Sequence, residues 1–255
     1  MKFGEKTLQR GDKGTDVEEL QLRLAGFRGT VWDGDFGPGT ELQVMTFQKD
    51  YMDIKTPTGI VNDDTFAALS QFAQTHSIGF ETIKCPCGEC DGFGQNRFKN
   101  KYRTGKSKIE AFYRYEYPGI HKAVLNTFRA AQFYANRAGY DIPYPTSGYR
   151  CWVNNEQKHR QSTNHMGKAL DIDFPLKPTE DKQDDCNRCD AVRGLLVEKC
   201  GFQIGWNASN MKALEPAHIA PSWIHMDVRC YSKKYLDDKY VIINIQELDG
   251  DLDGD

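Results

Sequence analysis

Residues 162–174 read STNHMGKALDIDF and bring a histidine, a glycine and two carboxylates together in one short stretch. His165 precedes Gly167, and Asp171 and Asp173 follow within an apolar run that is typical of a β-strand. A glycine allows the backbone to turn tightly, and alternate residues of a strand face the same side. Either aspartate could therefore lie beside the histidine, with the other held behind it.

A second histidine stands in the strand-like run WIHMDV at 223–228. His165, His225 and one carboxylate form a frequent set of catalytic zinc ligands, because three protein ligands leave a fourth position open for water. We expect one zinc ion bound by His165, Asp171 and His225, with Asp173 as the alternative carboxylate.

These residues lie in three segments that resemble the M15 group of zinc peptidases. Residues 146–150 read TSGYR and are followed by Asn154 and Asn155, residues 162–171 read STNHMGKALD, and residues 223–227 read WIHMD. The group contains D-alanyl-D-alanine carboxypeptidases and phage L-alanyl-D-glutamate endopeptidases, and it shares its fold with the Hedgehog signalling domain. The resemblance implies an α+β peptidase domain in which a small antiparallel sheet carries the zinc site.

The chain departs from the family pattern at two positions. An ungapped alignment places Asn164 where the family has its first zinc histidine, and we assign His165 because asparagine is a poor zinc ligand. Relatives carry an acidic residue three positions before the last zinc histidine, where this chain has Ser222. Candidates for the general base are Glu215, His218 and Asp227, and the motif does not choose among them.

The segment at 146–150 is expected to contact the substrate. In the family the counterpart of Arg150 lies near the substrate, and a guanidinium fork suits a carboxylate of the peptide stem. We assign Ser147 and Tyr149 to the same substrate-binding group. The expected reaction is hydrolysis of the peptide stem of bacterial peptidoglycan, at the L-alanyl-D-glutamate bond. The alternatives are a D-alanyl-D-alanine carboxypeptidase and a wall-binding protein whose peptidase fold has lost catalysis.

The beginning of the chain has the pattern of three short amphipathic helices that share one core. Thr15 and Glu18 have the spacing of a capping box, and Asn62 is a good helix N-cap. The apolar positions that recur at helical spacing are Val17, Leu20, Leu24, Val44, Phe47, Phe66, Leu69 and Phe72.

This stretch resembles the peptidoglycan-binding type 1 module. The similarity rests on LQRGDKG at 8–14, DGDFG at 33–37 and TGIV at 58–61, and it implies binding to the bacterial cell wall. We expect a peptidoglycan-binding domain over 1–75, a cysteine-containing linker over 76–110, a peptidase domain over 111–245, and an acidic tail over 246–255.

Composition excludes several classes of function. The 33 basic and 36 acidic residues nearly balance, which argues against a nucleic-acid-binding protein. No apolar run approaches the roughly 20 residues that span a membrane, and no signal peptide is expected. We expect a monomer that is made in the host cytoplasm and acts on the wall after release, as a phage endolysin would.

The chain has eight cysteines, and their state is open at the level of sequence. Cys87 and Cys90 share the two-residue gap of a zinc knuckle with Cys186 and Cys189, so the two pairs could close one structural site. The alternative states of the cysteines are disulfide bonds and reduced, partly buried thiols.

Overall fold

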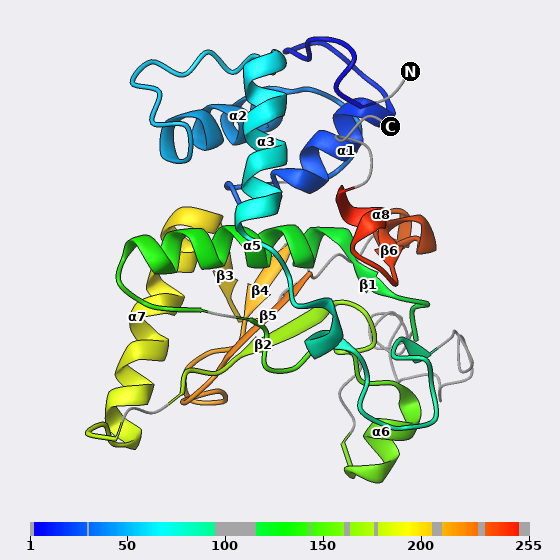
Figure 1. Ribbon diagram of the computed structural model, residues 1–255, viewed down its shortest axis with the longest axis vertical. Helices are drawn as coiled ribbons and strands as arrows, with labels where there is room; N and C mark the ends of the chain where they lie inside the picture. The colour runs from blue at the N-terminus through cyan, green and yellow to red at the C-terminus, as the bar shows by residue number, and fades with distance from the viewer. Residues whose placement is uncertain are drawn as a thin grey trace.

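The structure is a computed structural model, shown in Figure 1. It describes residues 3–29, 31–94, 116–142, 144–160, 164–175, 178–205, 211–228 and 233–249. Within this part of the chain, no helix has the length and apolar character needed to cross a lipid bilayer.

The N-terminal helical unit contains the three helices that the apolar spacing predicts. They are α1 (Thr15–Arg23), α2 (Pro38–Asp50) and α3 (Asp63–Thr75). Asn62 caps α3 and accepts a hydrogen bond from the backbone of Thr65, as expected. The predicted capping box at Thr15 is wrong. Thr15 is already helical, and Gly14 occupies the cap position without a side-chain bond.

Two buried glutamines hold the loops of this unit in place. Gln21 donates to Asp33 Oδ1 and Thr40 Oγ1, and its own Oε1 accepts from the backbone of Gly34. Gln48 donates to the carbonyl of Ile60 at 2.8 Å. Each side chain satisfies backbone groups that would otherwise be buried without partners. These two buried glutamines therefore stabilise the fold and cannot contact a wall polymer.

A four-stranded sheet forms the centre of the second half of the chain. Its order is β2 (Ala169–Ile172), β5 (Ile224–Val228), β4 (Lys212–Leu214) and β3 (Gln203–Ile204). Strand β5 pairs antiparallel with both β2 and β4, whereas β3 pairs parallel with β4. The mixed helices and small sheets agree with the expected α+β class.

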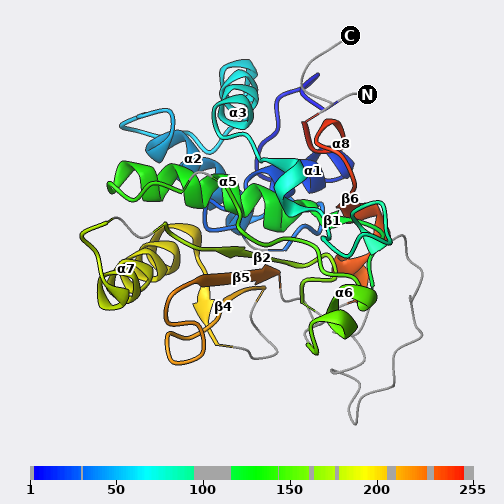
Figure 2. The same cartoon turned by 60° about the horizontal axis from the view of Figure 1, so that its bottom comes forward.

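Two long helices flank this sheet. Helix α5 (Lys122–Arg137) lies between the N-terminal helical unit and the sheet, and α7 (Lys182–Cys200) runs beside it (Figures 1 and 2). In the sequence, the helical spacing of Val192, Leu195 and Leu196 predicts α7 only from about residue 190. The helix begins earlier because Asp181 and Asp184 form a reciprocal capping box.

Short elements complete the described chain. They are η1 (Phe80–Ile83), β1 (Ile120–His121), α6 (Trp152–Gln157), η3 (Lys233–Leu236), η4 (Asp238–Tyr240), β6 (Val241–Ile242) and α8 (Gln246–Asp249). The predicted acidic tail begins at residue 246, and the structure describes its first four residues. They form α8, and Asp249 accepts two 2.7 Å hydrogen bonds from the buried Arg129. Residues 250–255 lie outside the described residues.

The N-terminal helical unit and the second half share one hydrophobic core. Phe27 packs against Tyr134 of α5, with ring centroids 5.7 Å apart. Lys212 of β4 donates to the carbonyl of Ala25 at 2.6 Å. A Cβ atom on Gly26 would lie 2.2 Å from Ala130 Cβ, so the close approach to α5 requires glycine there. A fragment ending at residue 75 would expose part of this core, and we therefore treat the two halves as one folding unit.

The buried ring of His121 makes the stability of the fold depend on pH. The ring is completely buried at the start of α5. Its Nδ1 accepts from the backbone of Ala123, and its Nε2 donates to the carbonyl of Tyr235. Burial is the main reason that the pKa of His121 falls to about 4, and nearby lysines add to it.

We predict that protonation of His121 destabilises the fold in acid. The folded pKa lies below the unfolded value of about 6.5, so the unfolded chain binds more protons and stability falls between pH 6.5 and 4. The loss should reach roughly 3 kcal/mol. Denaturant titrations at pH 7 and pH 4 check this. His121→Asn keeps a cap acceptor without a titrating ring, and its free energy of unfolding should fall by less. An equal fall in both proteins would contradict the assignment.

Candidate metal centre

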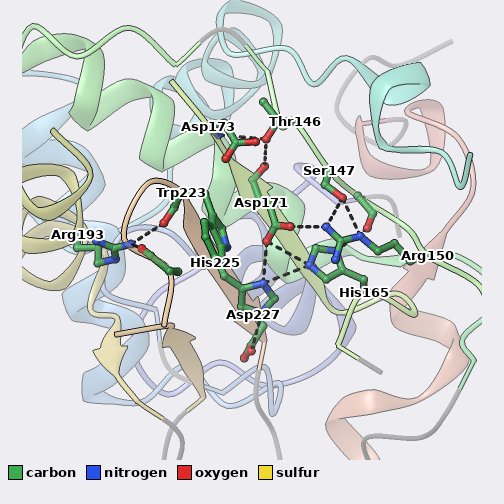
Figure 3. A network of polar contacts seen from close by, with 12 residues as sticks. Thr146, Ser147, Arg150, His165, Asp171, Asp173, Arg193, Trp223, His225 and Asp227 are labelled. Atoms are coloured by element: carbon green, nitrogen blue, oxygen red, sulfur yellow. Dashed lines mark hydrogen bonds and ion pairs between the residues drawn. The ribbon is translucent and has the colours of Figure 1, made fainter. Parts of the chain in front are cut away.

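The pairing of β2 with β5 brings the two halves of the predicted ligand set together. Asp171 stands directly opposite His225 in the antiparallel register, and side chains of directly paired residues lie on the same face of a sheet. His165 reaches the same point from the turn before β2 (Figure 3).

That turn depends on glycine. Gly167 has a φ of 115°, and a Cβ atom there would lie 2.5 Å from the carbonyl oxygen of Gly119. Both the left-handed backbone and the close contact exclude a side chain. The tight turn directs His165 back over the sheet, which supports its assignment in place of Asn164.

Three ligand atoms meet at this point. His165 Nε2 lies 3.1 Å from Asp171 Oδ1 and 3.2 Å from His225 Nδ1, and the last two atoms are 2.8 Å apart. Tetrahedral zinc with bonds of about 2.0–2.1 Å needs ligand atoms about 3.3 Å apart. All three residues are buried, with 1%, 7% and 4% of the surface of His165, Asp171 and His225 exposed. The donor types and their separations fit a zinc ion.

Both imidazoles are oriented by a hydrogen bond on the nitrogen that faces away from this point. His165 Nδ1 lies 2.7 Å from the carbonyl oxygen of Gly148, so Nδ1 carries the proton and Nε2 is free to bind metal. His225 Nε2 lies 3.3 Å from Asp227 Oδ2, which leaves Nδ1 toward the ligand cluster. Such outer partners fix the tautomer and the ring orientation of zinc histidines.

The electrostatics of the cluster follow from two carboxylates beside His225. Burial opposes a charge on this ring, but the hydrogen bonds to Asp171 and Asp227 prevail and raise the pKa of His225 to about 10. Burial and the neighbouring His225 lower the pKa of His165. Burial alone would raise the pKa of Asp171, yet the two imidazoles hold it well below its usual range. Metal binding needs neutral imidazoles, so it must displace the proton of His225.

Arg150 orients the carboxylate of the cluster. Its Nη2 donates to Asp171 Oδ2 at 2.6 Å and to Ser147 Oγ at 2.7 Å, and its Nε also donates to Ser147 Oγ. Arg150 Nη1 has no hydrogen-bond partner within the described chain, and 16% of this side chain is exposed. The structure thus gives Arg150 and Ser147 a positioning role that the sequence did not indicate.

Two other predicted residues lie away from the ligand cluster. Tyr149 is completely buried, and its hydroxyl donates to the carbonyl of Tyr117. A substrate cannot reach it there, so we no longer assign it a substrate contact. Asp173 follows the end of β2, and its backbone donates to Thr146 Oγ1 at 3.1 Å. The cluster contains Asp171 and not Asp173.

The three candidates for the general base occupy different environments. Glu215 donates its backbone N–H to the carbonyl of His225 at 3.1 Å, which extends the β4–β5 register by one pair and puts Glu215 on the face that carries His225. Asp227 is 1% exposed and lies behind His225. His218 is exposed in the turn after β4.

Sequence reasoning missed two supports of the site. Thr146 donates backbone and side-chain hydrogen bonds to the carbonyl of Asp171. Arg193 of α7 is 2% exposed and donates to the carbonyls of Ala220 and Trp223, which fixes the loop before His225 (Figure 3). Neither residue stands in a motif, and only the packing of α7 against that loop reveals Arg193.

Comparison with known proteins concerns the beginning of the chain. Residues 13–69 match the family model described as "Putative peptidoglycan binding domain". These residues form a peptidoglycan-binding domain.

One curated relative is the zinc D-Ala-D-Ala carboxypeptidase of Streptomyces albus G, which is 39% identical over 69 residues. The alignment covers 26% of this chain and 26% of the relative, and it lies at the N-terminal end. It therefore supports the peptidoglycan-binding domain and does not reach the histidines of the candidate centre.

We predict that His165→Ala and His225→Ala each lose one zinc ion per chain relative to the unaltered protein. Each substitution removes one of three ligands from a buried cluster. Metal analysis of dialysed protein checks the stoichiometry. Asp171→Ala should lose the same ion, whereas Asp173→Ala is the matched control and should keep it. Full zinc in both histidine variants would place the metal elsewhere.

Proposed function

We propose that this chain is a zinc peptidase that hydrolyses the peptide stem of bacterial peptidoglycan. The observation that carries the proposal is the meeting of His165, Asp171 and His225, whose ligand atoms lie 2.8–3.2 Å apart. Three protein ligands leave one position open, as catalytic zinc sites do. The peptidoglycan-binding domain packed on the same core supports the choice of substrate.

The proposed reaction needs a general base near the zinc ligands, and we assign this role to Glu215. Zinc, when bound, acidifies water and polarises a carbonyl oxygen. Glu215 would take the proton of the attacking water and pass it to the leaving amine. Glu215 directly follows β4 and its backbone pairs with His225. This place favours it over His218, which lies exposed in a turn, and over Asp227, which already holds His225.

Arg150 would act on both the protein and the substrate. Its Nη2 holds Asp171 in the ligand geometry. The other amino group of the fork remains to meet a carboxylate of the peptide stem, which suits the planar arrangement of guanidinium donors.

For the bond that is cut, we favour the L-alanyl-D-glutamate bond within the stem. Cutting the stem from the glycan opens the wall, whereas trimming a terminal D-alanine leaves the mesh intact. This choice rests on the proposed setting, a phage endolysin that acts on the wall after release from its host. A D-alanyl-D-alanine carboxypeptidase is the second candidate, and the same ligand set would serve it.

A binding protein without catalysis is the third candidate. The observation that favours it is Ser222, which stands where the M15 group carries an acidic residue. Glu215 would take the role of the acidic residue that Ser222 replaces, because its backbone pairs with that of His225 directly after β4.

We predict that Glu215→Gln lowers the rate of peptidoglycan hydrolysis by roughly 10²–10⁴-fold while zinc is retained. Rates are compared at equal zinc content on purified sacculi. Asp227→Asn should instead weaken zinc affinity by about 10–100-fold, with activity recovered on adding zinc. His218→Ala should stay close to the unaltered protein. If Glu215→Gln keeps its activity at full zinc, Glu215 is not the base.

We predict that digestion releases peptides that begin with D-glutamate and leaves L-alanine on the muramic acid. Mass spectrometry of the soluble fragments distinguishes this from the release of free D-alanine. D-alanine as the sole product would replace the endopeptidase by the carboxypeptidase. The absence of any new product from a zinc-loaded protein would favour the non-catalytic candidate.

We predict that binding and cutting separate in the variant His165→Ala/His225→Ala. The peptidoglycan-binding domain is untouched by these changes, so the full-length variant should sediment with sacculi and release no peptides. A variant that stays in the supernatant while remaining folded by circular dichroism would remove the wall-binding role of residues 13–69.

A further inference from the structure

A second group of metal-binding side chains lies apart from the histidine cluster. Cys85, Cys87 and Cys90 stand on one loop, and Cys151 comes from a position 61 residues beyond Cys90, at the start of α6. The four sulfur atoms all lie within 4.8 Å of one another. Sequence spacing suggested that Cys186 and Cys189 would complete such a site, but both lie on α7 and neither belongs to the group.

The geometry of the group is that of ligands around one ion. Cys87 Sγ and Cys90 Sγ are 3.5 Å apart, and tetrahedral zinc with Zn–S bonds of about 2.3 Å places its sulfurs about 3.8 Å apart. Cys85, Cys87 and Cys151 are 7%, 8% and 0% exposed, so the site is closed to solvent on most sides.

Backbone amides donate hydrogen bonds to two of the four sulfurs and would stabilise these two as thiolates. Cys151 donates its N–H to Cys85 Sγ, and Glu89 donates to Cys87 Sγ, both at 3.3 Å. Gly88, with a φ of 75°, turns the loop between Cys87 and Cys90. Hydrogen bonds to a charged acceptor favour the charged form, and thiolate is the form that binds metal.

We propose that Cys85, Cys87, Cys90 and Cys151 bind one structural zinc ion. Four thiolates close the tetrahedron, so no position remains for water or substrate. A four-iron cluster fits less well, because each of its thiolates binds a different iron and the sulfurs must stand farther apart.

The ion would join the loop to the segment that supports the histidine cluster. Tyr149 donates its N–H to the carbonyl of Ile83 at 2.7 Å, and a Cβ atom on Gly148 would lie 2.4 Å from that same oxygen. Gly148 accepts the hydrogen bond of His165, and Arg150 holds Asp171. The structural ion thus fixes the backbone at Gly148 and Arg150, which support His165 and Asp171. This consequence for catalysis rests on the proposed function. The assignment of the structural metal site does not.

Zinc content of the full-length protein, purified under reducing conditions, tests the proposal. We expect two zinc ions per chain in the unaltered protein and one in Cys87→Ser/Cys90→Ser. The matched control Cys186→Ser/Cys189→Ser removes a cysteine pair of the same spacing and should keep two. Equal zinc in Cys87→Ser/Cys90→Ser and the unaltered protein would overturn the proposal, and so would iron in place of zinc.

A second measurement does not depend on the folding of a cysteine variant. His165→Ala/His225→Ala keeps all the cysteines, and we expect it to retain one zinc ion. Replacing that ion with cobalt should give the intense sulfur-to-cobalt charge-transfer absorption of a tetrahedral thiolate site. A spectrum without sulfur charge transfer, or a disulfide between Cys87 and Cys90 in the purified protein, would overturn the proposal. Loss of the histidine site would leave this result unchanged, so the two metal assignments fail separately.

Discussion

The register between β2 and β5 is the constraint on which the candidate centre depends. Asp171 pairs with His225, and the same register continues through β4 to Glu215. The carboxylate and imidazole of two candidate ligands and the proposed base thereby form one row on one face of the sheet, with Glu215 directly after the end of β4. A slip of one residue would turn every side chain of the slipped strand to the opposite face. The hydrogen bonds of Ser147 and Thr146 to the backbone of Asp171 hold the outer edge of β2 against such a slip.

Each ligand is also held by one further group, and these groups come from different parts of the chain. A backbone carbonyl at Gly148 orients His165, a guanidinium at Arg150 orients Asp171, and a carboxylate at Asp227 orients His225. The alternation of charge along this chain of contacts explains why three titratable groups can be buried together. Buried charges are costly unless they are paired and hydrogen-bonded, and here every charge has its partner within 3.3 Å.

Sequence reasoning found what is local and missed what depends on packing. The helical spacing and the N-cap at Asn62 depend on residues close together in the chain, and the structure confirms both. The residue types of the histidine cluster could be read from separate motifs, and their role as metal ligands stays a prediction. The burial of Tyr149, the support from Arg193 and the approach of Cys151 to the cysteine loop could not. Cys151 follows Arg150 in a segment whose motif predicts substrate binding. The three cysteines near it in space lie more than sixty residues earlier in the chain. Choosing between Cys151 and the pair on α7 required the tertiary structure.

The shared core has a consequence for how wall binding would assist hydrolysis. Two domains on a flexible linker gain effective concentration from tethering, and the gain falls as the linker lengthens. Here Phe27 packs on α5, and the buried Lys212 ties Ala25 to the end of α7 through the carbonyl of Cys200. These contacts hold the peptidoglycan-binding domain in one orientation relative to the candidate metal centre. Binding would then select the glycan strands whose stems lie at the right distance and angle. A domain attached in this way reaches a smaller area of the wall than one on a flexible linker. It also avoids the loss of conformational entropy that a flexible linker undergoes each time a peptide stem enters the site.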